Sequence, residues 1–300
     1  MKITPINALA GLRVALTAPP ADRIPVFARE VIDPLRPFWE GWLRWQPQPT
    51  PISEMTPIDV ARSSRFYHPD LDCDRGLAAL DQLDQARVWP TCLAALDRAA
   101  SILRPDAHGI TLDAARFAFV LGDPSALDEK NDMYTGVGNV PGALLIMAWP
   151  TPFNLPRFPA IAVHELNHSV RFLYEPWSLR TTVGKYLVDE GVAECFAAEL
   201  YGEEMLGRWT TRLTIAEVEA LRPRYREAID VTGFDHIRGY IFGDWAADAM
   251  RYTRRGLPDF AGYAFGYRMV RAFLARTGTS AADATYLPWQ QIVDESHYLA

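Results

Sequence analysis

Apolar residues recur at helical spacing in two segments near the middle of the chain. The first segment, residues 158–174, has an apolar stripe at positions i, i+3, i+7 and i+10, formed by Val163, Leu166, Val170 and Leu173. The second segment, residues 186–200, has the same periodicity and follows a connection long enough for one turn-back. We therefore predict two antiparallel helices that pack at the core.

The N-terminal third of the chain is predicted to be helical. Helical patterns cover residues 22–45, where two prolines interrupt them, and residues 75–104, where Pro90 breaks them into a pair of helices. The proline-rich segment 47–57 lies between these patterns and is expected to be a connector.

Two short apolar runs in the middle of the chain indicate strands. Residues 116–121 are rich in aromatic and β-branched side chains and end at Gly122, and residues 143–149 follow the glycine-rich segment 136–142. The glycines of that segment do not match a dinucleotide-binding fingerprint, so we interpret it as a hairpin loop. These patterns predict an α+β protein that is mostly helical and contains a small β-sheet.

The C-terminal third is predicted to return to helix. Thr214 is the expected cap of a helix over residues 216–229, and residues 231–258 are expected to be irregular. A further helix is predicted over residues 261–277, and Pro288 is expected to start a last short helix.

Composition narrows the classes of partner and compartment. The formal net charge is −7 and no Lys/Arg run occurs, so neither nucleic acid nor an anionic membrane is expected as a partner. No apolar run reaches the roughly 18 residues of a membrane span, and the N-terminus lacks the apolar core of a signal peptide. Cys73, Cys92 and Cys195 are widely spaced, which favours a reducing compartment. We therefore expect a cytoplasmic protein.

Within the first predicted helix, residues 164–168 read H-E-x-x-H. His164 and His168 are one helical turn apart, so both imidazoles can bind one zinc ion. Glu165 can then act as a general base on water at the metal. A purely structural helix would leave Glu165 as an unpaired buried charge, which is costly. The motif therefore predicts a zinc-dependent hydrolase.

A third metal ligand is expected on the second predicted helix. Glu190 is the favoured candidate, with Glu194 one turn later either holding the free ring NH of a ligating histidine or replacing Glu190 as the ligand. Gly191 and its small neighbours are expected to let this helix approach the H-E-x-x-H helix closely. Asp189 and Glu199 are expected to be solvated or capping charges.

These motifs resemble a family of predicted zinc-dependent proteases that is often catalogued as a domain of unknown function. The family carries H-E-x-x-H followed by E-G-x-A-E, which here is residues 190–194, and a G-Y-x-x-G-Y helix, which here is residues 262–267. The resemblance runs from about residue 115 to the C-terminus. It implies a gluzincin-like fold, with a helical N-terminal region over residues 1–110 and a zincin-like catalytic region over residues 111–300.

The resemblance also implies roles for residues around the metal. An edge strand at residues 143–149 would bind an extended peptide, and the phenol of Tyr263 or Tyr267 would stabilise the oxyanion of the tetrahedral intermediate. Tyrosines at this spacing also serve as packing residues. Three further residues are weaker candidates for the donor: Tyr240, His236 and His297.

The sequence therefore predicts a zinc-dependent peptidase with a peptide or protein substrate. Two alternatives stay open at this stage. One is a zinc-dependent hydrolase of a non-peptide amide or ester, which would use the same chemistry. The other is a non-catalytic protein that binds zinc and a peptide, although such a protein has no use for the carboxylate of Glu165.

Overall fold

The computed structural model of the chain describes residues 1–44 and 50–300 and divides into two compact units. The first unit contains residues Met1–Arg98 and Asp113–Ala162, and the second contains Ala99–Leu112 and Val163–Ala300. Part of the predicted connector, residues 47–49, lies outside the described residues. The predicted division at residue 110 remains a prediction.

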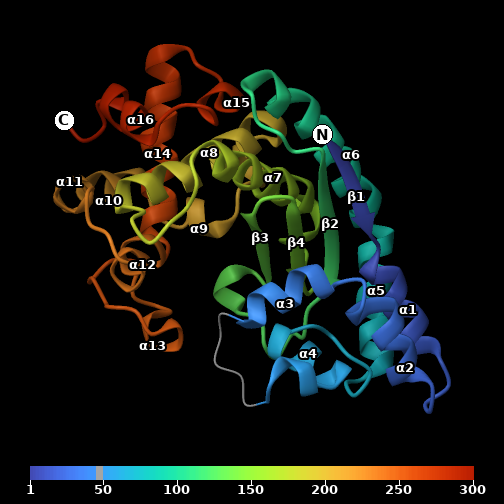
Figure 1. Cartoon of the computed structure of the whole chain (residues 1–300). Helices are drawn as coiled ribbons and strands as arrows, with labels where there is room; N and C mark the ends of the chain where they lie inside the picture. Colours follow the sequence, from blue (N-terminus) through green and yellow to red (C-terminus); the bar gives the residue numbers. More distant parts are fainter. Residues whose placement is uncertain (45–49) are drawn as a thin grey trace. The chain divides into compact units, whose positions relative to one another are not determined.

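The first unit contains a mixed sheet of four strands in the order β1-β2-β4-β3 (Figure 1). The strands are β1 (Lys2–Ile6), β2 (Ala114–Leu121), β3 (Tyr134–Val140) and β4 (Ala143–Ala148). β1 and β4 pair in parallel with β2, and β3 pairs antiparallel with β4. β2 and β4 form the buried middle of the sheet, which agrees with their apolar sequences.

The prediction that residues 143–149 form an edge strand is wrong. β4 pairs with β2 on one side and with β3 on the other, so its backbone has no free edge. The glycine-rich segment that we interpreted as a loop is itself the edge strand β3, which pairs with β4 from Tyr134 to Val140. Glycines contribute no side chains to an alternating pattern, which explains why the sequence concealed this strand.

The first unit also contains a series of helices packed around the sheet. They are α1 (Ala8–Thr17), α2 (Arg23–Phe27), the π-helical turn η1 (Ala28–Ile32), α3 (Arg36–Arg44), α4 (Pro57–Ser64), α5 (Cys73–Gln85) and α6 (Val88–Leu103), the last of which continues into the second unit. The predicted helix pair at residues 75–104 breaks at Arg87, which has a positive φ, rather than at Pro90. Pro90 lies in the first turn of α6, where its missing N–H is tolerated.

The second unit is helical. Its helices are α7 (Phe158–Tyr174), which begins in the first unit, α8 (Val183–Tyr201), α9 (Arg208–Thr211), α10 (Ile215–Ala220), α11 (Arg222–Ala228), α12 (Phe234–Phe242), α13 (Ala247–Met250), α14 (Ala261–Thr277), α15 (Ala281–Ala284) and α16 (Trp289–Ser296). Thr214 caps α10 in a capping box with Glu217, as predicted for the cap. The predicted irregular segment 231–258 instead contains α12 and α13.

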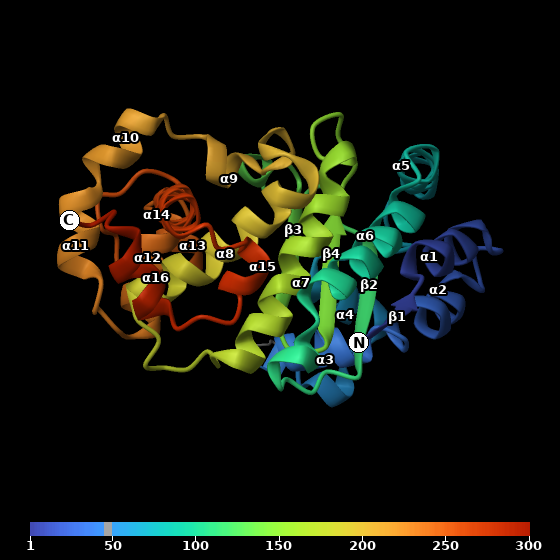
Figure 2. The ribbon, with the colours of Figure 1, turned by 90° about the horizontal axis from the view of Figure 1, so that it is seen from above.

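α8 and α14 cross at a pair of glycines, and Figure 2 shows α14 almost end-on beside α8. A Cβ on Gly191 would lie 2.3 Å from the carbonyl oxygen of Gly266, and a Cβ on Gly266 would lie 2.2 Å from that of Leu187. Only glycine therefore permits this crossing. Gly191 thus serves the contact with α14, whereas its role in the approach of α8 to α7 stays a prediction.

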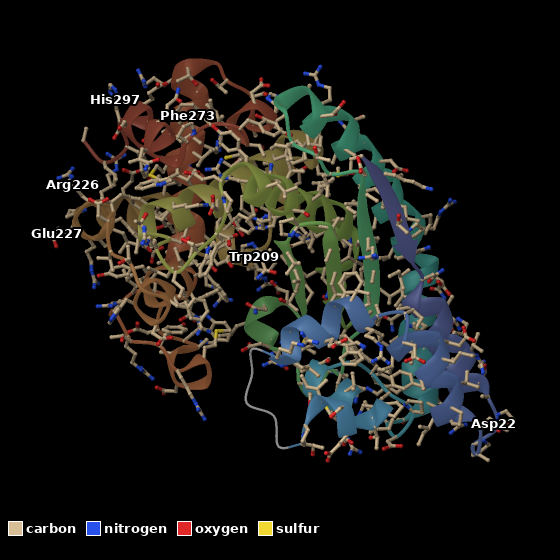
Figure 3. The ribbon with its side chains drawn as sticks, viewed as in Figure 1. Asp22, Trp209, Arg226, Glu227, Phe273 and His297 are labelled. Carbon is tan, nitrogen blue, oxygen red and sulfur yellow. The ribbon has the colours of Figure 1, made fainter. Side chains whose placement is uncertain are left out.

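Charged and apolar side chains separate as expected around these helices. Figure 3 shows Arg226, Glu227 and His297 pointing outward, whereas Phe273 on α14 lies in the interior of the second unit and is buried. Within residues 1–44 and 50–300, no helix combines the length and the apolar content that a membrane crossing requires.

Candidate metal centre

The H-E-x-x-H motif lies on α7, a helix that is buried on almost every side. Val163, Leu166 and Val170 of the predicted stripe are fully buried, and the polar residues of the motif are buried as well. His164 and His168 are neighbours on one face of α7, with ring centroids 4.6 Å apart and ring planes at 86°. Two imidazoles buried side by side need a polar partner, because a buried polar group without a hydrogen bond is costly.

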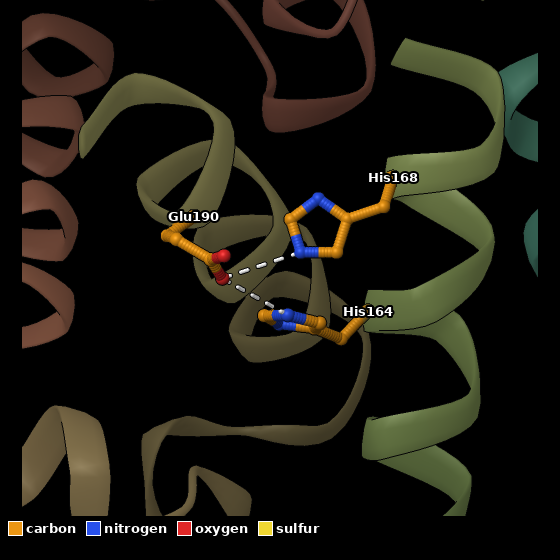
Figure 4. Close-up of side chains that lie close together, drawn as sticks. All are labelled: His164, His168 and Glu190. Carbon is orange, nitrogen blue, oxygen red and sulfur yellow. Dashed lines mark hydrogen bonds and ion pairs between the residues drawn. The ribbon is translucent and has the colours of Figure 1, made fainter. Parts of the chain in front are cut away.

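Glu190 on α8 supplies that partner. Its Oε2 lies 3.2 Å from Nε2 of His168 and 3.5 Å from Nε2 of His164 (Figure 4). Two nitrogens from α7 and one oxygen from α8 thus face a common point, and all three ligand atoms lie within 4.8 Å of one another.

Two of the three spacings between these atoms fit a zinc ion. Zinc binds histidine nitrogen and carboxylate oxygen at about 2.0–2.1 Å in tetrahedral geometry, which separates neighbouring donors by about 3.3–3.4 Å. The two separations from Glu190 lie within about 0.2 Å of this range. Two imidazoles and one carboxylate also leave the fourth position open, as in catalytic zinc sites.

Glu194 lies one turn after Glu190 and has different neighbours. Its Oε1 is 3.5 Å from Nδ1 of His164 and accepts a hydrogen bond of 2.5 Å from the indole N–H of Trp209. Glu194 therefore contacts the side of the His164 ring that faces away from Glu190, where a carboxylate orients the ring. Trp209 was not among the predicted residues, because a single tryptophan 15 positions later carries no sequence signal.

The electrostatics of the cluster favour a cation. Burial opposes a charge on His164, but the surrounding carboxylates outweigh burial and raise the pKa of His164 to about 9. Burial also opposes the charge of Glu190, yet His168 and His164 lower its pKa to about 2. Three buried carboxylates surround two imidazoles, and a bound dication would offset the cost of burying the carboxylate charges.

Glu165 is buried beside the first histidine. Burial is the main cause that raises the pKa of Glu165, and the imidazoles of His164 and His168 oppose the shift. A carboxylate with a raised pKa is a better proton acceptor near neutral pH than an exposed glutamate. The site therefore combines a metal-ligand set with a base next to it.

The two tyrosines of α14 have different surroundings. Tyr263 is partly buried, and burial is the largest cause of its raised pKa, followed by the carboxylate of Glu190, with Glu165 and Glu194 contributing. Tyr267 instead lies by Cys195 and Arg271, in a surface hollow on another side of α8. The structure thus brings Tyr263, and not Tyr267, toward the candidate ligands.

The three weaker candidates have partners of their own. His236 pairs with Arg255 at 3.0 Å, the carbonyl of Tyr240 accepts a hydrogen bond from Tyr225, and His297 caps the end of α16 in a left-handed conformation. None of these contacts involves a candidate metal ligand.

The prediction that Asp189 is solvated is wrong. Asp189 is fully buried and accepts hydrogen bonds of 2.7 Å from both Arg171 and Lys185. Nearly all residues of α8 from Val183 to Ala197 are buried, so an acidic residue next to Glu190 has no access to solvent. Glu199 is exposed and accepts the backbone N–H of Ala281 at the start of α15, which is a capping contact.

Comparison with known proteins finds a matching family and a relative of the chain. Residues 88–294 match the family described as "Predicted Zn-dependent protease (DUF2268)". The chain is also 33% identical over 264 residues to the "Uncharacterized protein YjfC" of Bacillus subtilis (strain 168), and this alignment covers 87% of the chain and 88% of that protein. No solved structure matches the chain significantly.

Proposed function

The chain belongs to the predicted Zn-dependent protease family, and from this premise and the geometry of the metal centre we propose that it is a zinc-dependent peptidase. The observation that carries the proposal is the convergence of His164, His168 and Glu190 within 4.8 Å, with Glu165 adjacent to the first histidine. We assign these three residues as the zinc ligands. The helices α7 and α8, which carry them, would form a zincin-like core.

The proposed reaction is hydrolysis of a peptide bond. When bound, zinc supplies a Lewis acid that polarises a carbonyl and makes water more acidic. Glu165 accepts the proton of the attacking water and later delivers it to the leaving amine. The burial that raises the pKa of Glu165 suits both steps, because the same group must gain and lose a proton near neutral pH.

Two further residues have supporting roles in this proposal. Glu194 holds Nδ1 of His164 and so leaves Nε2 free to face the metal. Tyr263 donates a hydrogen bond from its phenolic O–H to the oxyanion. Burial supports this role, because it raises the pKa of Tyr263 and keeps the phenol protonated.

The role of Glu165 is tested by Glu165→Gln, which keeps the size of the side chain and removes the base. We expect this variant to bind zinc like the unmodified chain but to lose at least about 100-fold in hydrolysis of a peptide library. His164→Ala should lose both zinc and hydrolysis, because one ligand is missing.

A matched control for the Glu→Gln change is Glu227→Gln, at an exposed position on α11. It should alter neither zinc content nor hydrolysis. Turnover by Glu165→Gln equal to that of Glu227→Gln would refute the assignment of the base. Rapid turnover of small amides or esters, with no cleavage of any peptide in the library, would instead favour the non-peptide hydrolase.

A further inference from the structure

Three buried charged side chains and one partly buried one lie beside the metal centre, on or directly after the same two helices that carry its ligands. They are Arg171 and Glu175 on α7 and its end, and Lys185 and Asp189 on α8; we call them the buried ion cluster. Arg171 is one helical turn beyond His168, and Asp189 directly precedes Glu190. Any displacement of the cluster therefore shifts the candidate ligands on both helices.

The hydrogen bonds of the cluster are directional and join α7 to α8. Asp189 receives one bond from Nε of Arg171 and another from Nζ of Lys185, both of 2.7 Å. Nη2 of Arg171 donates to Glu175 at 2.9 Å. Two positive and two negative charges thus balance, and the rigid fork of the guanidinium fixes the angle at which the helices meet.

The cluster also fixes α7 to the segment between α15 and α16. Nη1 of Arg171 donates to the carbonyl oxygens of Thr285 and Leu287, both at 3.1 Å. Asn167, next to His168, donates to the hydroxyl of Thr285 at 2.7 Å. The residues on both sides of His168 are therefore held by one segment of chain.

A stacked ring connects the cluster to the imidazole itself. Phe172 stacks on His168, with ring centroids 5.4 Å apart and planes at 14°, and Nζ of Lys185 lies 5.4 Å from the centre of the same phenyl ring. The ring of Phe172 therefore contacts His168 and also lies near the ammonium group of Lys185, which binds Asp189.

Stability alone does not explain such a cluster. Burying charges is costly, and replacing a buried ion pair with apolar residues of similar volume is often neutral or stabilising. The distinctive property of the cluster is its fixed geometry, which apolar side chains would not reproduce. That geometry is imposed one residue before Glu190 and three residues after His168.

We propose that the buried ion cluster is a positioning device that sets the separation between the two imidazoles of α7 and the carboxylate of Glu190, and so determines how tightly the chain binds zinc. This inference rests on the proposed zinc site. The hydrogen bonds of the cluster join its own side chains and the carbonyl oxygens of Thr285 and Leu287, so the cluster acts by fixing the helices.

The test measures the zinc dissociation constant by chelator competition, and the visible spectrum of the Co²⁺-loaded chain, for Asp189→Asn and Arg171→Lys. Both variants keep approximate size, and Arg171→Lys keeps the charge as well. We expect zinc to bind about 10–100 times more weakly in each, which is the usual effect of removing the partners that orient metal ligands. The Co²⁺ bands should change, because the arrangement of the ligands changes.

Tyr225→Phe is the control for a general loss of stability. It removes a partly buried hydrogen bond of 2.7 Å to the carbonyl of Tyr240 within the same unit, away from the cluster. It should lower the thermal unfolding midpoint while leaving zinc affinity and the Co²⁺ spectrum unchanged. Unchanged zinc affinity and spectrum in Asp189→Asn and Arg171→Lys, with lower unfolding midpoints, would overturn the proposal.

A combined variant separates positioning from stability more sharply. Arg171→Met, Lys185→Met and Asp189→Leu together replace the three central charges with apolar side chains, and should restore much of the stability lost in the single variants. We expect its zinc affinity to stay low. A folded triple variant with the zinc affinity of the unmodified chain would refute the positioning role, whereas failure of the unmodified chain to bind zinc would refute the proposed function instead.

Discussion

The two glutamates of α8 at the metal centre face different nitrogens of the imidazole rings. Glu190 and Glu194 lie on one face of α8, yet Glu190 approaches the Nε2 atoms of both histidines and Glu194 approaches Nδ1 of His164. Helical periodicity placed both carboxylates on the correct face. It contained no information about their distances from each nitrogen, because these depend on how α7 and α8 cross and on Trp209, which binds Glu194.

A prediction at this scale concerns the two tyrosines of α14. Tyr263→Phe should reduce kcat by about 100-fold or more without weakening zinc binding, because the variant removes one donor to the oxyanion and no metal ligand. Tyr267→Phe is the matched control, since Tyr267 lies by Cys195 and Arg271. Steady-state kinetics of both variants on one peptide substrate provide the measurement. A larger loss of kcat in Tyr267→Phe than in Tyr263→Phe would contradict the assignment.

Among the elements, those that carry the site were the ones predictable from sequence. The helical period and flanking residues located α7, α8 and α14, and α14 has the predicted bounds of 261–277. The sheet was harder to predict. β3 lacks an alternating pattern because of its glycines, and β1 (residues 2–6) pairs with a strand more than 100 residues away, a contact that local patterns do not encode.

The crossing of α8 and α14 gives a prediction at the scale of elements. Gly266→Ala should lower the free energy of unfolding by about 1–3 kcal/mol, because the added methyl group would meet the carbonyl oxygen of Leu187. Gly41→Ala is the matched control: Gly41 lies in α3 with nothing near its missing Cβ, so alanine should stabilise the chain by up to about 1 kcal/mol. Urea unfolding measures both effects. Equal stabilisation by the two substitutions would show that the helices do not cross as closely as described.

For the whole molecule, the second unit alone contains all the candidate ligands and the residues that orient them. Their burial has a cost, because three carboxylates and two imidazoles are enclosed together, and a bound dication would offset this cost. The family match covers most of this unit and part of the first, and it includes all three candidate ligands. The central claim is therefore that His164, His168 and Glu190 together bind one metal ion.

The zinc content of the purified chain, compared with that of a variant carrying His164→Ala, His168→Ala and Glu190→Gln together, tests this claim most directly. Elemental analysis after dialysis against metal-free buffer should find about one zinc ion per unmodified chain and almost none in the variant. Equal zinc contents in the two proteins, or no retained divalent metal in the unmodified chain, would contradict the claim.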